Sequence, residues 1–336
     1  MGPVDSPVRF TSRSDTPQLR GEGVRSTRLR CVLSVAAAGA LPLAARAQGP
    51  TAPKVTGYVQ TRFEAIADSA LFKVRRARLG VQGSLTPWAT YKLQAELRSG
   101  GTGATAATVA ATDLYVALTH GPWIATIGQS KTPLSVEFIR SSTVLELPER
   151  SMVVDSLAPN RDVGVKIEWN STGPLTLNGG VFNGDGINRA ANRDKDFLYL
   201  ARAVVRPIAG LHLGAAAAGK PDTVTWDIEG TLERGRVAAR AEYLWRHRSA
   251  ADVTTRGWYA LAAYQLQPKR LQLVGRVQQF DPDDALGGDR ITGYTGGAQY
   301  FFAGDDLKLQ LEYTVFAEQG PAVGNNRLIA QMQVRW

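Results

Sequence analysis

The feature that most constrains this chain is a repeated alternation of apolar and polar residues in segments about ten residues long. In residues 327–336, for example, Ala330 and Met332 alternate with Gln331 and Gln333. Successive side chains of a β-strand point to opposite faces, so each such segment predicts a strand with one apolar and one polar face. The sequence therefore predicts an all-β protein whose sheet has water on one side and an apolar environment on the other.

Sixteen segments of this kind follow one another, and the connections between them differ in length. The predicted strands are residues 54–65, 71–84, 88–99, 109–119, 123–130, 161–170, 175–182, 197–206, 210–219, 223–233, 236–246, 255–266, 270–280, 290–302, 307–317 and 327–336. Connections after even-numbered segments are short turns. The long connections follow odd-numbered segments: residues 100–108, 131–159, 183–196, 281–289 and 318–326. Short turns at one rim and long loops at the other, with an even strand count, are typical of bacterial outer-membrane barrels.

These patterns predict a transmembrane antiparallel up-and-down β-barrel of about 16 strands. No run of 18 or more apolar residues occurs, so no transmembrane helix is expected. The last strand ends at Trp336, and a terminal aromatic residue after alternating apolar residues resembles the assembly signal of outer-membrane barrels. A soluble all-β repeat such as a propeller is the alternative fold, but its blades would not separate short from long connections.

Residues 1–48 are expected to be a leader that ends in a secretory signal peptide. A basic region ending at Arg30 precedes an apolar stretch, and a small-x-small cleavage site ends at Ala47. Cleavage there would remove the only cysteine, Cys31, and leave one barrel domain, residues 49–336. The leader carries seven Lys/Arg and three Asp/Glu, so its removal lowers the net charge from +9 to +5. The remaining net positive charge therefore gives little support for nucleic-acid binding.

The connection at residues 131–159 differs from the others because it runs for 29 residues without a clear strand. Loops this long in compact domains are usually functional or disordered. It contains seven charged residues and three apolar clusters, around Phe138, Leu145 and Val153, which need a surface to pack against. We therefore expect this long loop to fold into the mouth of the barrel, where it narrows a pore.

Four stretches resemble the phosphate-selective porin O and P family: residues 72–79 (FKVRRARL), 128–133 (GQSKTP), 161–164 (RDVG) and 179–184 (GGVFNG). The order and spacing of these stretches carry the resemblance, which covers roughly residues 54–190, while the later half resembles the family only in pattern. The resemblance implies a sixteen-stranded, trimeric, anion-conducting porin whose third external loop forms the constriction. The long loop is the third external loop by our strand count.

The candidate anion-binding and pore-lining residues are basic residues on polar strand faces and in the long loop: Arg62, Arg76, Arg78, Lys131, Arg140, Arg150, Lys166, Arg240 and Arg276. Rings of Arg or Lys select anions in pores, and guanidinium groups bind phosphate through paired hydrogen bonds. The long loop holds three basic and four acidic residues, whereas phosphate-specific family members are expected to present a lysine cluster there. Strand alternation assigns Lys73 and Arg75 to the lipid-facing side. This predicts either contact with anionic lipopolysaccharide or a local bulge.

The sequence thus predicts an outer-membrane porin for passive diffusion of small hydrophilic solutes, preferring anions and, in the sharper version, phosphate or polyphosphate. A general, weakly selective porin is one alternative, and a surface adhesin or receptor, or a barrel enzyme, belongs to a different class. No catalytic residue, cofactor or metal site is expected, because the three histidines lack evident partners and the acidic loops lack the spacing of a calcium loop. The expected partners are small anions, outer-membrane lipid and lipopolysaccharide, and further copies of the chain in a homotrimer, with no nucleic acid.

Overall fold

A computed structural model describes residues 51–98, 108–189, 192, 194–320 and 324–336. The strands are β1 (Lys54–Ile66), β2 (Ser69–Thr86), β3 (Ala89–Arg98), β4 (Thr108–His120), β5 (Trp123–Lys131), β6 (Arg161–Asn170), β7 (Leu175–Phe182), β8 (Leu198–Ile208), β9 (Leu211–Lys220), β10 (Thr223–Arg234), β11 (Val237–Arg248), β12 (Val253–Gln267), β13 (Leu271–Asp281), β14 (Ile291–Ala303), β15 (Leu307–Glu318) and β16 (Arg327–Arg335). The prediction of about sixteen strands is confirmed, with strand ends shifted by a few residues. The predicted leader and cleavage site lie outside the described residues.

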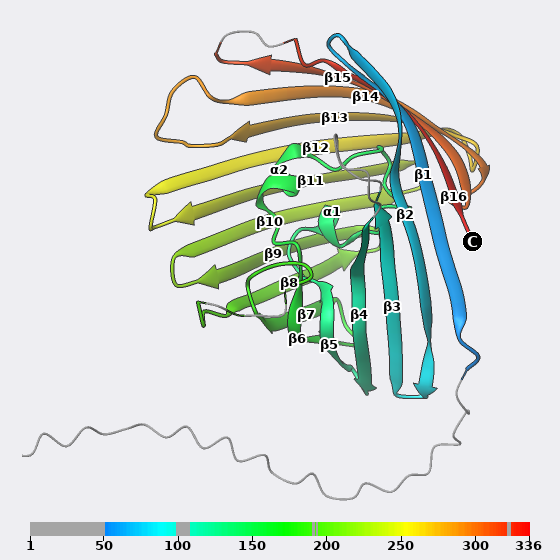
Figure 1. The fold of residues 1–336 in the computed structure, drawn as a ribbon, viewed down its shortest axis with the longest axis vertical. Coiled ribbons are helices and arrows are strands. Elements are labelled where there is room, and N and C mark those ends of the chain that lie inside the picture. Colours follow the sequence, from blue (N-terminus) through cyan, green and yellow to red (C-terminus); the bar gives the residue numbers. More distant parts are fainter. Residues whose placement is uncertain (1–50, 99–107, 190–191, 193, 321–323) are drawn as a thin grey trace, which may run out of the picture. The chain divides into compact units, whose positions relative to one another are not determined.

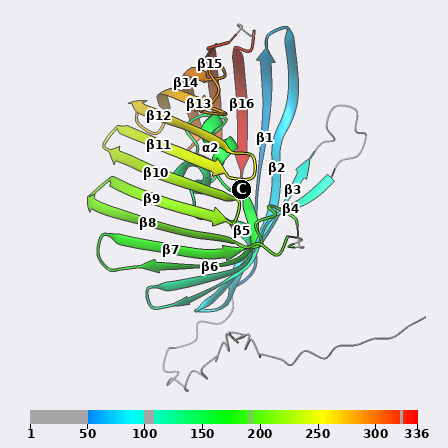
Figure 2. The ribbon, with the colours of Figure 1, turned by 90° about the vertical axis from the view of Figure 1, so that its left-hand side faces the viewer.

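Each strand pairs antiparallel with its neighbours in the chain, and β1 pairs with β16, which closes the barrel. Figures 1 and 2 show β1 and β16 side by side at this seam. Gly57 and Trp336 exchange backbone hydrogen bonds of 3.2 and 3.0 Å there. A Cβ on Gly57 would lie 2.4 Å from the Trp336 indole ring, so a glycine makes room for the terminal aromatic residue.

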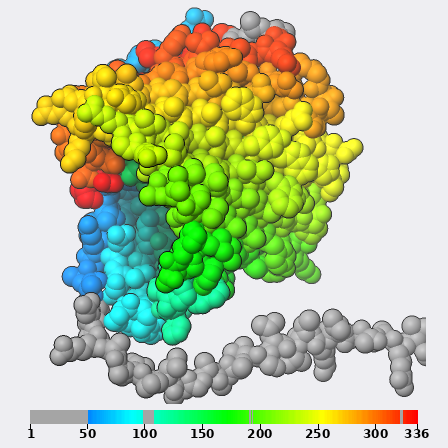
Figure 3. Space-filling view, turned by 180° about the vertical axis from the view of Figure 1, so that it is seen from behind, coloured from blue at the N-terminus to red at the C-terminus, as the bar shows by residue number. Residues whose placement is uncertain are grey.

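The barrel has a polar interior and an apolar outer surface, as β10 illustrates. Thr225, Asp227 and Glu229 are buried, whereas Trp226 and Ile228 between them are exposed. Figure 3 shows the outer wall of the barrel over the strands coloured green to orange. A lipid-facing apolar face opposite a water-facing polar face is the arrangement that a membrane requires of a barrel.

The connections divide between the two rims as the sequence predicts. All turns from an even to an odd strand have two to four residues. The longest connections run from odd to even strands, and the longest of them, residues 132–160 between β5 and β6, is called the interior loop below.

The interior loop contains two short helices, α1 (Val136–Ile139) and α2 (Met152–Leu157). Ser135 and Ser151 cap them, since their side chains accept hydrogen bonds from backbone N–H groups three residues further on. No helix among the described residues is long and apolar enough to cross a membrane.

Candidate functional site

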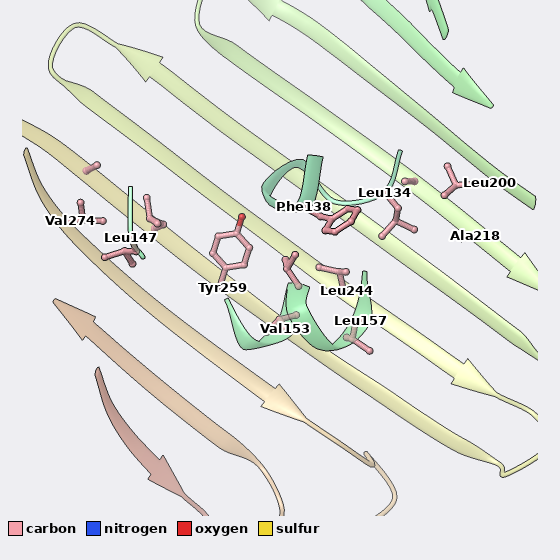
Figure 4. Packing of buried hydrophobic residues seen from close by; sticks show 14 of the residues in the cluster. Leu134, Phe138, Leu147, Val153, Leu157, Leu200, Ala218, Leu244, Tyr259 and Val274 are labelled. Carbon is pink, nitrogen blue, oxygen red and sulfur yellow. The ribbon is translucent and has the colours of Figure 1, made fainter. Parts of the chain in front are cut away.

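One side of the interior loop packs on the inner wall of β8 to β13 through apolar side chains (Figure 4). Phe138, Val153 and Leu157 of the loop share a buried cluster with Leu244 of β11 and Tyr259 of β12. Burying a side chain the size of Leu or Val contributes about 1.5–3 kcal/mol. The apolar clusters that stand out in the loop sequence thus contact apolar side chains on part of the inner wall.

Other strands hold the same loop by hydrogen bonds. The hydroxyls of Tyr58 on β1 and Ser142 lie 2.6 Å apart, and Lys308 Nζ on β15 donates to the Leu145 carbonyl at 3.1 Å. Contacts to β1 and β15, in addition to those on β8 to β13, place the loop inside the barrel (Figure 1).

Glu149 of the interior loop is the centre of an arginine cluster. Its carboxylate accepts hydrogen bonds from Arg62 at 2.6 Å, from Arg75 at 2.6 and 3.2 Å, and from Arg76 at 3.3 Å. Burial alone would raise the pKa of Glu149, but Arg76, Arg62 and Arg75 hold it far below the usual range. Three guanidinium groups therefore share one carboxylate and favour its ionised form.

A β-bulge in β2 explains how consecutive arginines reach the same carboxylate. Gln60 pairs with Arg76 and Thr61 with Val74, which leaves Arg75 as the extra residue. A bulge of this kind bends the strand and redirects side chains that strict alternation would send to the other face. Arg75 therefore points into the barrel next to Arg76 and contacts the interior loop.

Between the bulge and the external rim, the side chains of β2 point to the side opposite to the one that strict alternation predicts. Lys73 Nζ lies 2.8 Å from Glu64 Oε2, a buried carboxylate on β1. Of the two explanations for Lys73 and Arg75, the structure shows the bulge, so neither residue is placed to contact lipopolysaccharide.

A cavity of about 430 Å³ lies between the interior loop and the wall of β2 to β4. Its charged lining residues are Arg75, Arg76, Arg78, Arg150, Arg161, Glu96 and Asp155. Arginines thus outnumber carboxylates in the lining by five to two. In a site with limited water, such an excess attracts anions more strongly than the same charges do in bulk solvent.

The arginines of this cavity differ in how far carboxylates neutralise them. Arg78 donates to Glu96 at 2.9 Å, and Arg161 donates to Asp113 at 2.7 Å. Arg150 instead donates to two backbone carbonyls, at 3.1 and 3.0 Å, and forms no ion pair with the described residues. Its charge is thus the least compensated of the five. Burial, together with the charge of Glu149, raises the pKa of Asp155, the acid on the same side of the loop.

Arg76, Arg78 and Arg150 are the predicted residues that the structure brings together in this cavity. Arg62 lies behind them, with its guanidinium held by Glu149 and by Gln331 at 2.5 Å. Arg276 is buried below the loop and donates to the backbone carbonyl of Glu149 at 2.9 Å. These last two arginines hold the loop in place.

Lys131 does not line the cavity, and its predicted role as an anion ligand needs correction. Its Nζ donates to the carbonyls of Phe138, Ile139 and Arg140 at 2.8, 3.0 and 2.7 Å. An ammonium group has three N–H donors, and all three are used here. Lys131 therefore holds the end of α1. Lys166 lies beside it and donates to the Lys131 carbonyl at 3.3 Å.

Arg140 and Arg240 lie on another side of the loop, around Glu146. Arg240 binds both oxygens of Glu146 at 3.1 and 3.0 Å, and Arg140 binds it at 3.1 Å. Burial would raise the pKa of Glu146, but the two arginines lower it. Arg140 and Glu146 line a second cavity of about 570 Å³ that reaches the short turns after β10 and β14.

Two arginines of the arginine-lined cavity, Arg75 and Arg161, were not among the predicted site residues. Alternation assigns Arg75 to the lipid side, and a local bulge was one of the two explanations that the sequence left open for it. Arg161 is the first residue of β6, and alternation along that strand groups it with the lipid-facing Val163. The sequence signal that could have placed Arg161 near the cavity is its position directly after the long loop.

Comparisons with known proteins agree with this architecture. A family model described as phosphate-selective porin O and P matches residues 57–231 and 211–336. An uncharacterized protein of Caulobacter vibrioides is 31% identical over 157 residues, which is 43% of this chain and only 30% of that relative's length.

Solved structures show the same barrel. The trimer form of OmpT, an outer membrane protein of Vibrio cholerae, has a TM-score of 0.61 at 11% identity, with 86% of this chain and 100% of that chain covered. A mutant of Rh. blastica porin has a TM-score of 0.58 at 13% identity, with 85% and 100% covered. At such low identity these likenesses show a shared fold.

Proposed function

The chain belongs to the phosphate-selective porin O and P family and is an outer-membrane porin, and we propose that it conducts small hydrophilic solutes by passive diffusion with a preference for anions. The selective region is the cavity between the interior loop and β2 to β4. The second cavity, at the short turns, lies on the way out of the barrel towards the other rim.

The observation that supports anion preference is the surplus of arginines around the first cavity. Glu149 is shared by three guanidinium groups, and Arg150 has no carboxylate partner among the described residues. Rings of basic side chains are a common basis of anion selectivity in pores. Guanidinium groups also suit phosphate, because they donate two parallel hydrogen bonds to neighbouring oxygens.

Arg150→Gln tests the anion preference directly, since it removes a positive charge without breaking an ion pair among the described residues. In planar bilayers with a KCl gradient, the reversal potential should show the anion-to-cation permeability ratio falling by about three- to tenfold. Arg206→Gln is the matched control, because Arg206 on β8 is exposed near the short-turn rim, and its guanidinium donates to the Thr176 hydroxyl and forms no ion pair with the described residues. An unchanged ratio in Arg150→Gln would refute anion selection at this cavity.

The narrower proposal is that the cavity binds phosphate, and block of the chloride current by phosphate tests it. Phosphate at low concentration should reduce chloride current, and the double variant Arg76→Ala with Arg78→Ala should relieve the block and move selectivity towards cations. If millimolar phosphate leaves the chloride current of the parent protein unchanged, phosphate binding is excluded and the porin function remains.

A general, weakly selective porin is the second candidate, and specific ion pairs favour it. Glu96 and Asp113 neutralise Arg78 and Arg161, which reduces the field that an entering anion meets. Weak selectivity of this kind would disappear at high salt, because the Debye length falls to about 3 Å at 1 M ionic strength. Selectivity that persists in high salt therefore favours the anion site.

The assembly that goes with this function is a homotrimer of residues 49–336, exported by a signal peptide cleaved near Ala47. The OmpT structure, which shares the barrel fold and is a trimer form, supports the proposed trimer, and the apolar outer wall suits outer-membrane lipid and lipopolysaccharide. We propose that the protein acts as a channel and not as an enzyme. Native gels of the detergent-extracted protein and N-terminal sequencing would test the oligomeric state and the cleavage site.

A further inference from the structure

Three carboxylates meet on the inner wall under α1. Glu229 of β10 and Glu242 of β11 are directly opposite each other in the strand pairing, and Asp227 lies two residues along the same face. All three side chains are buried, with relative exposures of 6%, 2% and 1%. Like charges directly opposite each other destabilise a sheet, and burial of carboxylates adds to the cost.

Each carboxylate has a protein donor on one of its two oxygens. Asp227 Oδ2 accepts from the Ser135 backbone N–H at 3.0 Å. Glu242 Oε1 accepts from the Tyr259 hydroxyl at 2.5 Å and from the Glu137 N–H at 2.7 Å. The Glu229 Oε1 atom accepts from Arg202, the one basic side chain that pairs with the cluster among the described residues.

The other oxygen of each carboxylate has no partner in the described part of the chain. These atoms are Asp227 Oδ1, Glu229 Oε2 and Glu242 Oε2, and all three are shielded from solvent. Buried polar atoms without a partner are rare in folded proteins and call for a specific explanation. Here three of them belong to three neighbouring acids, and a bound cation or protons shared between the carboxylates would satisfy them.

We propose that Asp227, Glu229 and Glu242 bind one hard divalent cation, Ca²⁺ or Mg²⁺, between the interior loop and the wall of β10 and β11. One carboxylate oxygen of each residue lies within 4.8 Å of the others. Oxygen ligands stand about 2.3–2.6 Å from Ca²⁺ and about 2.0–2.1 Å from Mg²⁺, so ligands on opposite sides of the ion are about 4–5 Å apart. The cluster therefore offers carboxylate oxygens, negative charge and an oxygen spacing that fit Ca²⁺ or Mg²⁺.

The cation would also fix the interior loop, independently of the proposed anion preference. Ser135 and Glu137 donate their backbone N–H groups to the same carboxylates, so the ion and α1 share ligands. Ser135 adopts a left-handed φ of 69°, which is unfavourable for a residue with a side chain and needs such support. Phe138 of α1 lines the arginine-lined cavity, which links the cation to the pore.

Terbium luminescence tests the site in the barrel refolded into detergent free of lipopolysaccharide. Tb³⁺ takes oxygen ligands as Ca²⁺ does, and Tyr259 beside Glu242 serves as its excitation donor. We expect sensitised emission from the parent protein that excess Ca²⁺ displaces. Asp227→Asn and Glu242→Gln should weaken Tb³⁺ binding on the order of tenfold or more, while Tyr259→Phe should lower the emission and leave binding by calorimetry intact.

Glu312→Gln is the matched control, because Glu312 is also a buried interior carboxylate with one unpartnered oxygen and one arginine partner, Arg327 at 2.9 Å, but it lies outside the group of three acids. It should keep the terbium affinity of the parent. A second readout needs no variant: the thermal unfolding midpoint of the parent should be higher in Ca²⁺ or Mg²⁺ than in EDTA. Absence of sensitised emission, or midpoints that are equal with both cations and with EDTA, would overturn the proposal and leave shared protons as the partner of the three oxygens.

Discussion

Towards β8 to β13 the interior loop buries Val153 and Leu157 against apolar side chains, whereas towards β2 to β4 it faces a cavity lined by five arginines. The apolar side excludes water and fixes the position of the loop. The arginine side leaves charged groups next to open space, with Glu149 as the connection between loop and wall. The difference shows that one segment serves both as a packed structural element and as one wall of an arginine-lined cavity.

Loss of the Glu149 carboxylate should have the largest effect on this arrangement. Glu149→Gln leaves Arg62, Arg75 and Arg76 without their shared anion, and breaking buried ion pairs of this kind costs about 3–5 kcal/mol. The free energy of unfolding in urea would show the loss. Asp306→Asn is the control, since Asp306 forms an exposed pair with Arg335 and its loss should cost at most about 1 kcal/mol. Equal stability of the two variants would show that apolar packing alone positions the loop.

Truncation on the apolar side should lower stability without changing ion selectivity. Leu157→Ala creates a cavity in the buried cluster and should cost about 2–5 kcal/mol. Leu286→Ala, at an exposed position in the loop between β13 and β14, is the control. A changed anion-to-cation permeability ratio in Leu157→Ala, measured by reversal potential, would contradict the separation of roles between the two sides.

Acid should weaken the arginine side before it weakens the apolar side. The pKa of Glu149 is depressed in the folded protein, so its contribution to stability is complete above its unfolded pKa of about 4.3 and declines as pH falls below that value. Unfolding midpoints between neutral pH and pH ~3 should fall more steeply for the parent protein than for Glu149→Gln. Parallel pH profiles would show that Glu149 is not the group responsible.

The smallest expected effect concerns Asp155, which adds one negative charge to the arginine-lined cavity. Because its pKa is raised, it takes up a proton at a pH above the usual range near 3.9, and the cavity then becomes more positive. Anion preference should therefore increase as pH is lowered through this range. Asp155→Asn should show the higher preference already at neutral pH and lose the pH dependence. A variant with the same pH dependence as the parent would assign the effect to another group.

Most of the fold could be predicted because the barrel wall repeats one simple rule. Alternation identifies all sixteen strands, and the division of short and long connections identifies the rims. The long loop could be identified because its apolar clusters do not follow the alternation of a strand. What alternation could not supply is the position of bulges, since a single extra residue such as Arg75 leaves composition unchanged and alters only the pairing register.

The candidate site was predictable only in part, for a related reason. Sequence parity indicates which arginines point inward, but it does not say which of them find a partner. Arg62 forms an ion pair with Glu149 and Lys131 donates to loop carbonyls, whereas Arg150 lines the cavity and forms no ion pair with the described residues. The carboxylates Glu229 and Glu242 are 13 residues apart in the chain and become neighbours only through the register of β10 with β11. Such encounters depend on tertiary pairing, which the local pattern does not contain.

The seam between β1 and β16 has a kinetic consequence. Tyr58 pairs with Arg335, so the barrel is completed by residues from opposite ends of the described chain. Bringing such distant segments together requires a large loss of chain entropy before any hydrogen bond of the seam forms, and contacts of long sequence separation make folding slow. Until Trp336 reaches the space beside Gly57, both edge strands present unpaired backbone groups. Closure of the β1–β16 seam therefore limits when these two edge strands stop being prone to aggregation.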